Sequence, residues 1–352
     1  MKETMRANVL TEWERLEMKE MALPVPGKEE VLIRVLYAGV CGSDITVYHH
    51  RHLTATVPRI MCHEILGIVE EINTDMPVPY RIGDRVVVHP LGECGNCQAC
   101  LDGDFHVCRE LRIMGLHMDG GFAEYVCAQT KRVFKVADDI PDKAAILTEP
   151  LAVGFHACTR AAVEPGEKVL VIGGGPIGIL CGVCARYFGA SEVVIAEVNE
   201  ERLQLIRSFG FETIDSGKED LCAAAVRMTG ANVFDKVFEA SGSQAGALAL
   251  ADVTKIRGRA GIVGIPSTAR EYQTNKMVLK EISLIGSRVH TLKNFERTVE
   301  MVEKLYREKQ FDFERMIAAQ FPLEKLEEAI RLQESGTKNG KILIRIGKGA
   351  EA

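Results

Sequence analysis

The chain has 352 residues, 47% of them hydrophobic and 26% charged, which is the composition of an ordinary soluble globular protein. The net charge of −6 argues against nucleic-acid binding, because proteins of that class carry a basic face and a high isoelectric point. Since the length exceeds what one hydrophobic core usually organises, we expect two domains.

Neither a targeting signal nor a membrane partner is predicted. Residues 1–20 carry scattered charges and lack the apolar segment of a secretory signal. The longest uncharged run of the central region, residues 169–185, is slightly shorter than the ~20 residues of a membrane span, and glycines interrupt it. We therefore expect a cytoplasmic protein, whose 11 cysteines bind metal or lie reduced in a core.

The first forty residues are typical of an antiparallel β unit. Residues 5–10 and 30–37 are strand-like, and residues 23–27, with two prolines and a glycine, are expected to form a turn between elements. A motif with several reactive side chains follows, Gly-Val-Cys-Gly-Ser-Asp at residues 39–44. It places a thiol at Cys41, a hydroxyl at Ser43 and a carboxylate at Asp44.

Four scattered side chains form a candidate catalytic zinc site. Zn²⁺ accepts thiolate, imidazole and carboxylate ligands, and a catalytic site keeps one position open for water or substrate. Taken singly, each residue is better explained as a core cysteine, a satisfied histidine or a capping acid, so the spacing alone only points toward the site. The four residues are Cys41, His63, Glu64 and Glu149.

Residues 94–108 give a more specific signal. Their cysteines follow the spacing C-x2-C-x2-C-x7-C in a polar loop, which is typical of a closed tetrahedral zinc site that holds its loop in shape. An iron–sulfur cluster is the lesser alternative because the Cys-Pro signature is missing. Asp102 and Asp104 have the wrong charge for a nucleic-acid zinc knuckle. The predicted ligands are Cys94, Cys97, Cys100 and Cys108.

A dinucleotide site is predicted at residues 168–178. Residues 169–172 are typical of a strand buried on both faces, and residues 179–188 of a buried helix. Between them stands the turn Gly-x-Gly-x-x-Gly, whose glycines permit a tight turn, the approach of a pyrophosphate and close packing of the helix. The residues of this turn predicted to contact the cofactor are Gly173, Gly175, Pro176, Ile177 and Gly178.

The next predicted strand, residues 191–197, ends in Glu197. This acid stands about 20 residues beyond the glycine turn, the spacing of a carboxylate that binds the adenosine ribose. Because such a carboxylate repels a 2′-phosphate, we expect NAD rather than NADP. The alternative is a solvated charge at a strand end, and the nearby Arg202 weakens the exclusion of NADP.

The remaining sequence continues an alternation of strands and helices. Strands are expected at residues 212–215, 233–241, 258–265 and 282–286, and a long amphipathic helix at residues 292–309.

Taken in order, these motifs resemble those of the zinc-dependent medium-chain dehydrogenases, over essentially the whole chain. The resemblance is closest to the polyol branch, which includes sorbitol, threonine and butanediol dehydrogenases and hexonic-acid oxidoreductases, and which typically has a glutamate at the position of Glu149. It implies an α/β protein with a GroES-like β-rich catalytic domain (residues 1–152, with the structural zinc lobe) and a Rossmann domain with a doubly wound parallel sheet (residues 153–290). Residues 291–352 would return to the first domain, with residues 340–346 as the returning strand.

The resemblance also implies further cofactor contacts and an assembly. Ser241 would lie near the adenosine, and the nicotinamide would lie near Gly264, Ile265, Ser287 and Arg288. Two zinc ions per chain, NAD and a homodimer or homotetramer are expected.

Two positions depart from the family pattern. Cys62 stands where a glycine usually precedes His63, and it is interpreted as a core thiol or as a displaced ligand. Thr46 stands where a histidine often ends the proton relay. His49, His50 and His52 are nearby substitutes for that histidine, or else part of a solvated loop.

The expected reaction moves a hydride from a secondary alcohol of a polyol or hexonate-like sugar acid to NAD, giving a ketone. Zinc would lower the pKa of the alcohol and Ser43 would take its proton, while Asp44 orients a neighbour. The sequence does not rank Glu64 and Glu149 as the direct ligand. L-threonine 3-dehydrogenase and 2,3-butanediol dehydrogenase are the alternatives, and a non-catalytic zinc-binding protein is a remote one.

The hexonate interpretation depends on residues 113–125, which resemble hexonate oxidoreductases most. There His117 either reaches the catalytic cleft or lies in a surface loop. Because an anionic sugar acid needs a cation, Arg288 or Arg51 is a candidate partner for its carboxylate.

Overall fold

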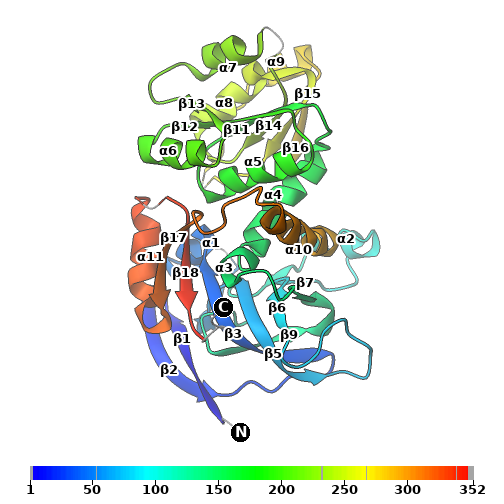
Figure 1. Cartoon of the computed structure of the whole chain (residues 1–352), viewed down its shortest axis with the longest axis vertical. Helices are drawn as coiled ribbons and strands as arrows, with labels where there is room; N and C mark the ends of the chain where they lie inside the picture. Colours follow the sequence, from blue (N-terminus) through cyan, green and yellow to red (C-terminus); the bar gives the residue numbers. More distant parts are fainter. Residues whose placement is uncertain (1–2, 53, 231–232, 267, 338, 348–352) are drawn as a thin grey trace. The chain divides into compact units, whose positions relative to one another are not determined.

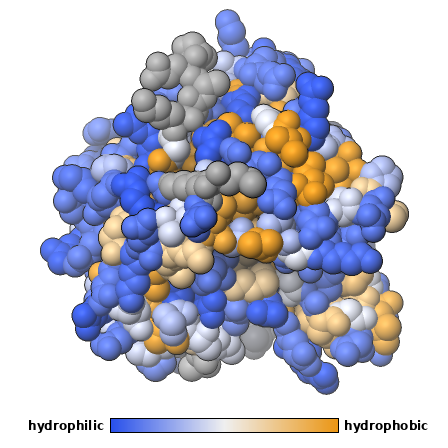
Figure 2. Space-filling model, turned by 90° about the horizontal axis from the view of Figure 1, so that it is seen from below, coloured by the Kyte–Doolittle hydropathy of each residue, from blue (hydrophilic) through white to orange (hydrophobic). Residues whose placement is uncertain are grey.

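The computed structural model describes residues 3–52, 54–230, 233–266, 268–337 and 339–347. The chain divides into two compact units, one made of Met1–Glu149 with Thr291–Ala352 and the other of Pro150–His290 (Figure 1). Within the described part of the chain, no helix combines the length and the apolar character that crossing a membrane requires. On the face seen in Figure 2, hydrophilic side chains predominate around smaller hydrophobic patches.

Two sheets organise the first unit. A three-stranded sheet has the order β2-β1-β4, and a seven-stranded sheet has the order β10-β6-β5-β3-β18-β17, with β9 also pairing with β3. Their strands are β1 (Thr4–Glu12), β2 (Arg15–Ala22), β3 (Glu30–Val40), β4 (Arg59–Ile60), β5 (Glu64–Asn73), β6 (Arg85–Val88), β9 (Tyr125–Gln129), β10 (Val133–Lys135), β17 (Ile317–Pro322) and β18 (Lys341–Arg345).

The predicted returning strand is confirmed as β18, which lies beside the central strand β3. Their antiparallel register sets Ile342 opposite Val40. On the other side of β3, strand β5 sets Glu64 opposite Gly39. Strands β3 and β18, which are far apart in the sequence, therefore pair in one sheet, and β3 is the strand that separates Glu64 from β18.

The strands predicted at residues 5–10 and 30–37 are confirmed as β1 and β3, but β2 was not predicted. Most of its side chains are exposed or half-buried and several are charged, so its pattern lacks a buried face. It forms because its main chain pairs along almost all of β1. Pairing of this kind leaves little signal in a hydrophobic pattern.

Several helices and two short strands complete the first unit. The helix predicted at residues 292–309 is confirmed as α10 (Leu292–Arg307), which buries one apolar face. The cysteine loop contains a short helix and a 3₁₀ turn. The other elements are α1 (Gly42–Tyr48), β7 (Leu91–Gly92), α2 (Gln98–Leu101), η1 (Phe105–Val107), β8 (Arg112–Ile113), η2 (Thr130–Arg132), α3 (Asp142–Ala145), the start of α4 (Thr148–Ala161), η4 (Leu323–Lys325) and α11 (Leu326–Ser335).

The second unit is a doubly wound domain around a six-stranded parallel sheet of order β13-β12-β11-β14-β15-β16. Helices α5 and α6 lie on one side of the sheet, and α7, α8 and α9 on the other (Figure 1). The elements are β11 (Lys168–Ile172), α5 (Pro176–Tyr187), β12 (Glu192–Glu197), α6 (Glu200–Ser208), β13 (Glu212–Asp215), α7 (Leu221–Thr229), β14 (Phe234–Glu239), α8 (Gln244–Val253), β15 (Thr254–Ile262), α9 (Thr274–Leu279) and β16 (Ser283–Gly286).

The strand order reverses between β11 and β14, where Ile172 lies opposite Glu239. Open α/β sheets bind their ligands beyond the carboxyl ends of the strands at such a reversal. All the predicted strands of this unit are present, although β15 begins four residues earlier than the predicted residue 258. Lys255 and Arg257 obscure that beginning in the hydrophobic pattern.

Candidate functional site

The four cysteines of residues 94–108 converge in the first unit. The sulfur–sulfur distances are 3.5 Å for Cys94–Cys108, 3.5 Å for Cys97–Cys100, 3.8 Å for Cys97–Cys108 and 4.0 Å for Cys94–Cys100. Zinc–sulfur bonds of about 2.3 Å at tetrahedral angles place ligand sulfurs about 3.8 Å apart. The four side chains therefore fit a structural zinc ion.

The protonation of this lobe also favours a cation. Main-chain N–H groups of Arg109 and Cys100 lower the pKa of Cys97 to about 6. Burial raises the pKa of Cys100 to about 12. Four thiolates at neutral pH therefore require a bound cation, and metal binding here is coupled to loss of protons.

A second cluster brings together one ligand atom each from Cys41, His63 and Glu64, all within 4.8 Å of one another. Cys41 is the N-cap of α1, directly after β3, and Glu64 begins β5. Because β3 and β5 pair with Gly39 opposite Glu64, the sheet itself brings the segments around residues 41 and 63 together.

Buried polar atoms of this cluster lack protein partners. Nδ1 of His63 and Oε2 of Glu64 are buried and make no hydrogen bond to any described residue. Burial lowers the pKa of His63, but the hydrogen bond to Cys41 and the charges of Glu149 and Asp44 raise it well above its usual value. Negative charge thus converges on a thiol, an imidazole and a carboxylate, a donor set that fits zinc.

Glu149 lies outside the set of mutually close ligand atoms found among the described residues, although its charge acts on His63. It is buried in the first turn of α4. Three of the four predicted ligands are therefore brought together, and ligation by Glu149 stays a prediction.

Asp44 connects the two segments that carry these ligands. Its Oδ2 accepts a hydrogen bond from the Cys41 N–H at 2.8 Å, and its Oδ1 accepts one from the Cys62 N–H at 3.2 Å. The side chain is fully buried, and burial raises the pKa of its carboxyl group. Asp44 therefore orients main chain on both sides of the cluster, as second-layer carboxylates of metal sites do.

Cys62 is a packed core thiol. Its φ of +85° explains why glycine is the easier residue at this position. The buried Sγ donates to the carbonyls of Gly39 at 3.5 Å and Glu64 at 3.3 Å. Burial raises its pKa well above the usual value, so the neutral thiol is favoured. A side chain on Gly120 would lie 1.9 Å from the Cys62 carbonyl oxygen, so this segment is tightly enclosed.

The candidate relay residues have different partners. Thr46 donates its hydroxyl hydrogen bond to the Gly42 carbonyl within α1. His49 lies between Glu14 and Glu334, 2.5 Å from each. His50 stacks on Trp13, with ring centroids 4.1 Å apart.

His52 differs from these two histidines because it lies beside His117. Their ring centroids are 5.9 Å apart, and both rings contact the Thr54 hydroxyl, at 3.3 Å and 2.8 Å respectively. The loop that carries His117 also packs against the metal cluster, since a side chain on Gly115 would lie 2.5 Å from the Cys62 nitrogen.

The glycine turn of the second unit has the predicted geometry. Gly173 has a φ of +103°, and a side chain on Gly178 would lie 1.8 Å from the Gly173 carbonyl oxygen. Gly175 is the N-cap of α5, with Pro176 and Ile177 in the first turn, and no atom lies within 4 Å of the position its Cβ would take. The helix N-terminus is thus open to a phosphate group.

Glu197 is buried at the end of β12 and is held by main-chain donors. Its Oε2 accepts from the Gly174 N–H at 2.8 Å, while its Oε1 accepts from the Val198 and Asn199 N–H groups at 2.8 Å and 3.0 Å. Nη1 of Arg202 lies 3.7 Å from Oε2. The carboxylate is thus attached to the glycine turn itself.

Glu239 was not predicted as part of this site. It is buried at the end of β14 and accepts from the Ser241 and Gly242 N–H groups, both at 3.0 Å. Gly264 follows β15 and lies against Gly242, 2.6 Å from its nitrogen if a Cβ were added. The sheet thus brings Ser241 and Gly264 together.

Three further predicted contacts follow β15 and β16. Ser287 donates its N–H to the Ile262 carbonyl at 2.9 Å. Ile265 is 85% exposed, and Arg288 is also exposed. Ile265 and Arg288 are thus accessible to a ligand, while the buried Oγ of Ser287 makes no hydrogen bond to a described residue.

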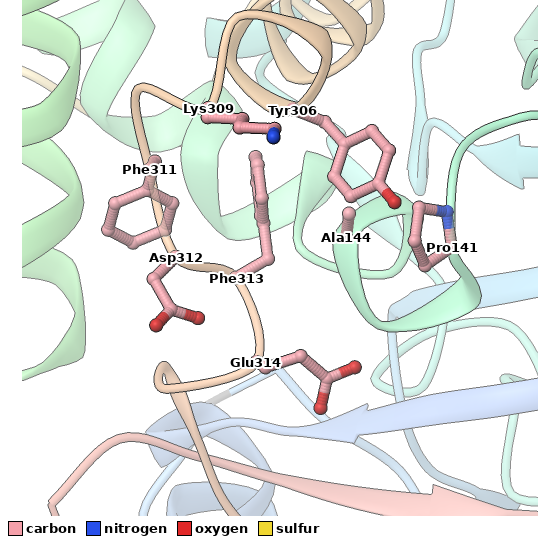
Figure 3. A pocket seen from close by; sticks show the side chains of 8 residues that line it. All are labelled: Pro141, Ala144, Tyr306, Lys309, Phe311, Asp312, Phe313 and Glu314. Atoms are coloured by element: carbon pink, nitrogen blue, oxygen red, sulfur yellow. The ribbon is translucent and has the colours of Figure 1, made fainter.

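A hollow of 260 Å³ elsewhere in the first unit contains none of the predicted site residues. In Figure 3 it lies among aromatic side chains next to Lys309. Phe311 and Phe313 pack edge to face at 5.0 Å, and Glu314 pairs with Lys143 at 2.5 Å. Two of the aromatic rings that line it therefore pack on each other and its Glu314 is paired with a lysine outside the lining, and we assign it no ligand.

Two family models match the chain. The alcohol dehydrogenase GroES-like domain matches residues 27–138, and the zinc-binding dehydrogenase model matches residues 176–304. The chain therefore belongs to the zinc-binding alcohol dehydrogenase family, in agreement with its fold and its two cysteine-containing clusters. It is an oxidoreductase that acts on CH–OH groups.

Relatives match nearly the full length. The chain is 30% identical to L-galactonate-5-dehydrogenase of Escherichia coli K12, covering 97% of this chain and 98% of that protein. It is 31% identical to L-threonine 3-dehydrogenase of Deinococcus deserti, covering 93% and 94%. A crystal structure of a zinc-binding dehydrogenase from Sinorhizobium meliloti 1021 bound to NADP superimposes with a TM-score of 0.90 at 26% identity, covering 98% and 100%.

Proposed function

We propose that this enzyme oxidises a secondary hydroxyl of a sugar acid or polyol to a ketone, with NAD as the hydride acceptor. The observation that carries the proposal is the cluster of the half-buried Cys41 with the buried His63 and Glu64, whose donor set and unpaired polar atoms fit a catalytic zinc ion. Sugar acids are favoured as substrates by the relative named for L-galactonate. The relative named for L-threonine keeps that amino acid as the second candidate.

The bound zinc ion would supply Lewis acidity and so lower the pKa of a substrate hydroxyl. Ser43, two residues from Cys41, takes the hydroxyl proton. Its Oγ is buried and makes no hydrogen bond to a described residue, so it is available to a substrate. Because the Thr46 hydroxyl is hydrogen-bonded within α1, the proton passes from Ser43 toward solvent by another route.

The preference for NAD rests on Glu197. Three main-chain N–H groups hold this carboxylate where a ribose 2′-substituent is recognised. An anion there repels a 2′-phosphate. Arg202 is the opposing feature, and the Sinorhizobium relative was crystallised with NADP. A comparison of kcat/KM for the two nucleotides tests this assignment directly.

Substrate recognition is proposed to involve His52, Thr54 and His117. Their polar groups already contact one another at the edge of the loop that packs on Cys62. For a sugar acid, Arg51 or Arg288 would pair with the carboxylate, and both are exposed.

We also propose that the chain is a homodimer or homotetramer that uses the edge strand β16. This strand ends the parallel sheet and exposes Leu284, while Val278 and Leu279 of the preceding helix are 75% and 83% exposed. An edge with exposed apolar side chains is a surface that proteins normally cover. Light scattering of the wild-type protein and of Leu284→Asp tests the assembly. A wild-type protein that is monomeric in solution would contradict it.

The substrate is tested by kcat/KM on hexonates, hexitols, L-threonine, 2,3-butanediol and ethanol, followed by NADH absorbance. We expect the hexonates to be best and ethanol to be poor. Arg51→Ala and Arg288→Ala are compared with each other, since the residue that binds the carboxylate should affect hexonates more than hexitols. Equal activity on both classes in all three proteins would refute the carboxylate partner.

A further inference from the structure

A buried ion pair connects the last strand of the sheet to the candidate metal cluster. Nζ of Lys341 lies 2.5 Å from Oε1 of Glu64, and the two side chains are 5% and 1% exposed. The same ammonium group donates to the Val40 carbonyl at 3.0 Å. Lys341 therefore contacts both a candidate ligand and the main chain directly before Cys41.

The sheet register fixes where this ammonium group lies. Lys341 begins β18, whose pairing with β3 sets Ile342 opposite Val40. Its backbone N–H donates to the Met316 carbonyl at 2.8 Å. Gly340 enters the strand with a φ of +124°, and a side chain there would lie 2.4 Å from the same carbonyl oxygen. The position of the main chain is thus fixed on both sides of Lys341.

The other carboxylate oxygen of Glu64 occupies the space beside Gly39, which has no side chain. A Cβ on Gly39 would lie 2.0 Å from Oε2 of Glu64 and 2.9 Å from its Cδ. The carboxylate therefore rests against the bare main chain of β3. One oxygen is held by a cation and the other occupies space that only glycine leaves.

Stability alone is a poor explanation for this arrangement. Removing two charges from water is costly, and apolar pairs of similar volume often replace buried ion pairs without loss of stability. This pair, however, involves a residue whose carboxylate lies within 4.8 Å of the Cys41 and His63 donor atoms. A fixed charge at that point determines where the carboxylate stands before any ion binds.

We propose that Lys341 and Gly39 are positioning residues of the metal centre, which together hold the Glu64 carboxylate beside Cys41 and His63 as a pre-set ligand. The inference rests on the proposed function, because it presupposes that this cluster binds the second zinc ion. It adds that the C-terminal strand is part of that centre. Partners of metal ligands that act in this way typically contribute 10- to 100-fold to metal affinity.

The test is metal binding, without turnover. The open site is emptied by a chelator that leaves the cysteine lobe loaded, and it is then titrated with Zn²⁺ against a competing chromophore and with Co²⁺ by absorption. In Lys341→Met we expect zinc affinity to fall roughly 10- to 100-fold and the Co²⁺ spectrum to change. Gly39→Ala, which keeps Lys341, is expected to weaken the same site because its Cβ displaces the carboxylate.

The matched control is Lys236→Met, which removes the partly buried pair Lys236–Glu167 (3.0 Å) in the second unit. It should leave both the affinity and the Co²⁺ spectrum unchanged. Retention of the cysteine-lobe zinc in each variant shows that the first unit is folded. Unchanged affinity and spectrum in both Lys341→Met and Gly39→Ala would overturn the inference. An unmodified protein that binds no second ion would instead overturn the proposed function, and the inference with it.

Discussion

Replacing Glu197 by alanine removes an acceptor and a charge from the nucleotide site, with consequences that can be separated. Of the three N–H groups that it accepts from, only that of Gly174 is buried, since Val198 and Asn199 are exposed and can bond to water. The expected destabilisation is therefore that of one buried unsatisfied donor, about 1–3 kcal/mol.

The cofactor effect is larger and has a defined direction. A hydrogen bond to an ionised carboxylate contributes ~1.5–3 kcal/mol, so losing one to the ribose should lower kcat/KM for NAD by roughly 10- to 150-fold. For NADP the value should rise, because the repelling charge is gone and Arg202, whose Nη1 was 3.7 Å from the carboxylate, can meet a 2′-phosphate.

The assay is kcat/KM for both nucleotides with the best substrate, together with the melting temperature. Glu197→Gln is the control, because it keeps an acceptor for Gly174 and removes only the charge. It should approach the alanine variant in cofactor preference but be more stable. Equal kcat/KM for NADP and NAD in the wild-type protein would refute the reasoning. An unchanged nucleotide preference in both variants would also refute it.

Three further predictions concern the first unit. Metal analysis should find about two zinc ions per chain, with the cysteine-lobe ion the slower to leave under a chelator; one ion per chain and none at the lobe would contradict this. Cys62→Gly should retain both ions, since Cys62 has φ +85° and its thiol packs in the core; loss of one ion would identify the thiol as a ligand. The hydrogen bonds that His49 donates to the carboxylates of Glu14 and Glu334 raise its pKa, so this contact stabilises the fold below the ordinary histidine pKa, and the stabilisation is lost as pH rises through the raised value. An NMR titration should show that raised pKa, and His49→Gln should remove the corresponding pH dependence of stability. An ordinary histidine pKa at His49 would contradict the stabilising contact with Glu14 and Glu334.

The sequence predicted best what is encoded locally. The cysteine lobe and the glycine turn each lie within about fifteen residues, so spacing alone specifies their geometry. The strands of the parallel sheet were predicted for the same reason, because burial on both faces produces continuous apolar runs.

What was missed depends on pairing between distant strands. Lys341 and Glu64 are 277 residues apart and meet because β3, β5 and β18 are neighbours in one sheet. In the sequence, Glu239 looks like an ordinary strand residue. Only the structure shows that the residues after β14 fold back and donate hydrogen bonds to its carboxylate. His49 and His52 are three residues apart in the sequence. His49 is hydrogen-bonded to Glu14 and Glu334, whereas His52 lies beside His117, and the spacing of the residues does not predict this difference.

The open cluster of Cys41, His63 and Glu64 is proposed to hold the zinc ion on which oxidation depends. The most direct measurement titrates Zn²⁺ into protein that retains only the lobe ion, while NADH formation is followed with the best substrate. We predict that activity is near zero at one zinc per chain, rises linearly with the second equivalent and does not recover in Cys41→Ala. Full activity with the lobe ion alone, or recovery in Cys41→Ala, would contradict the claim.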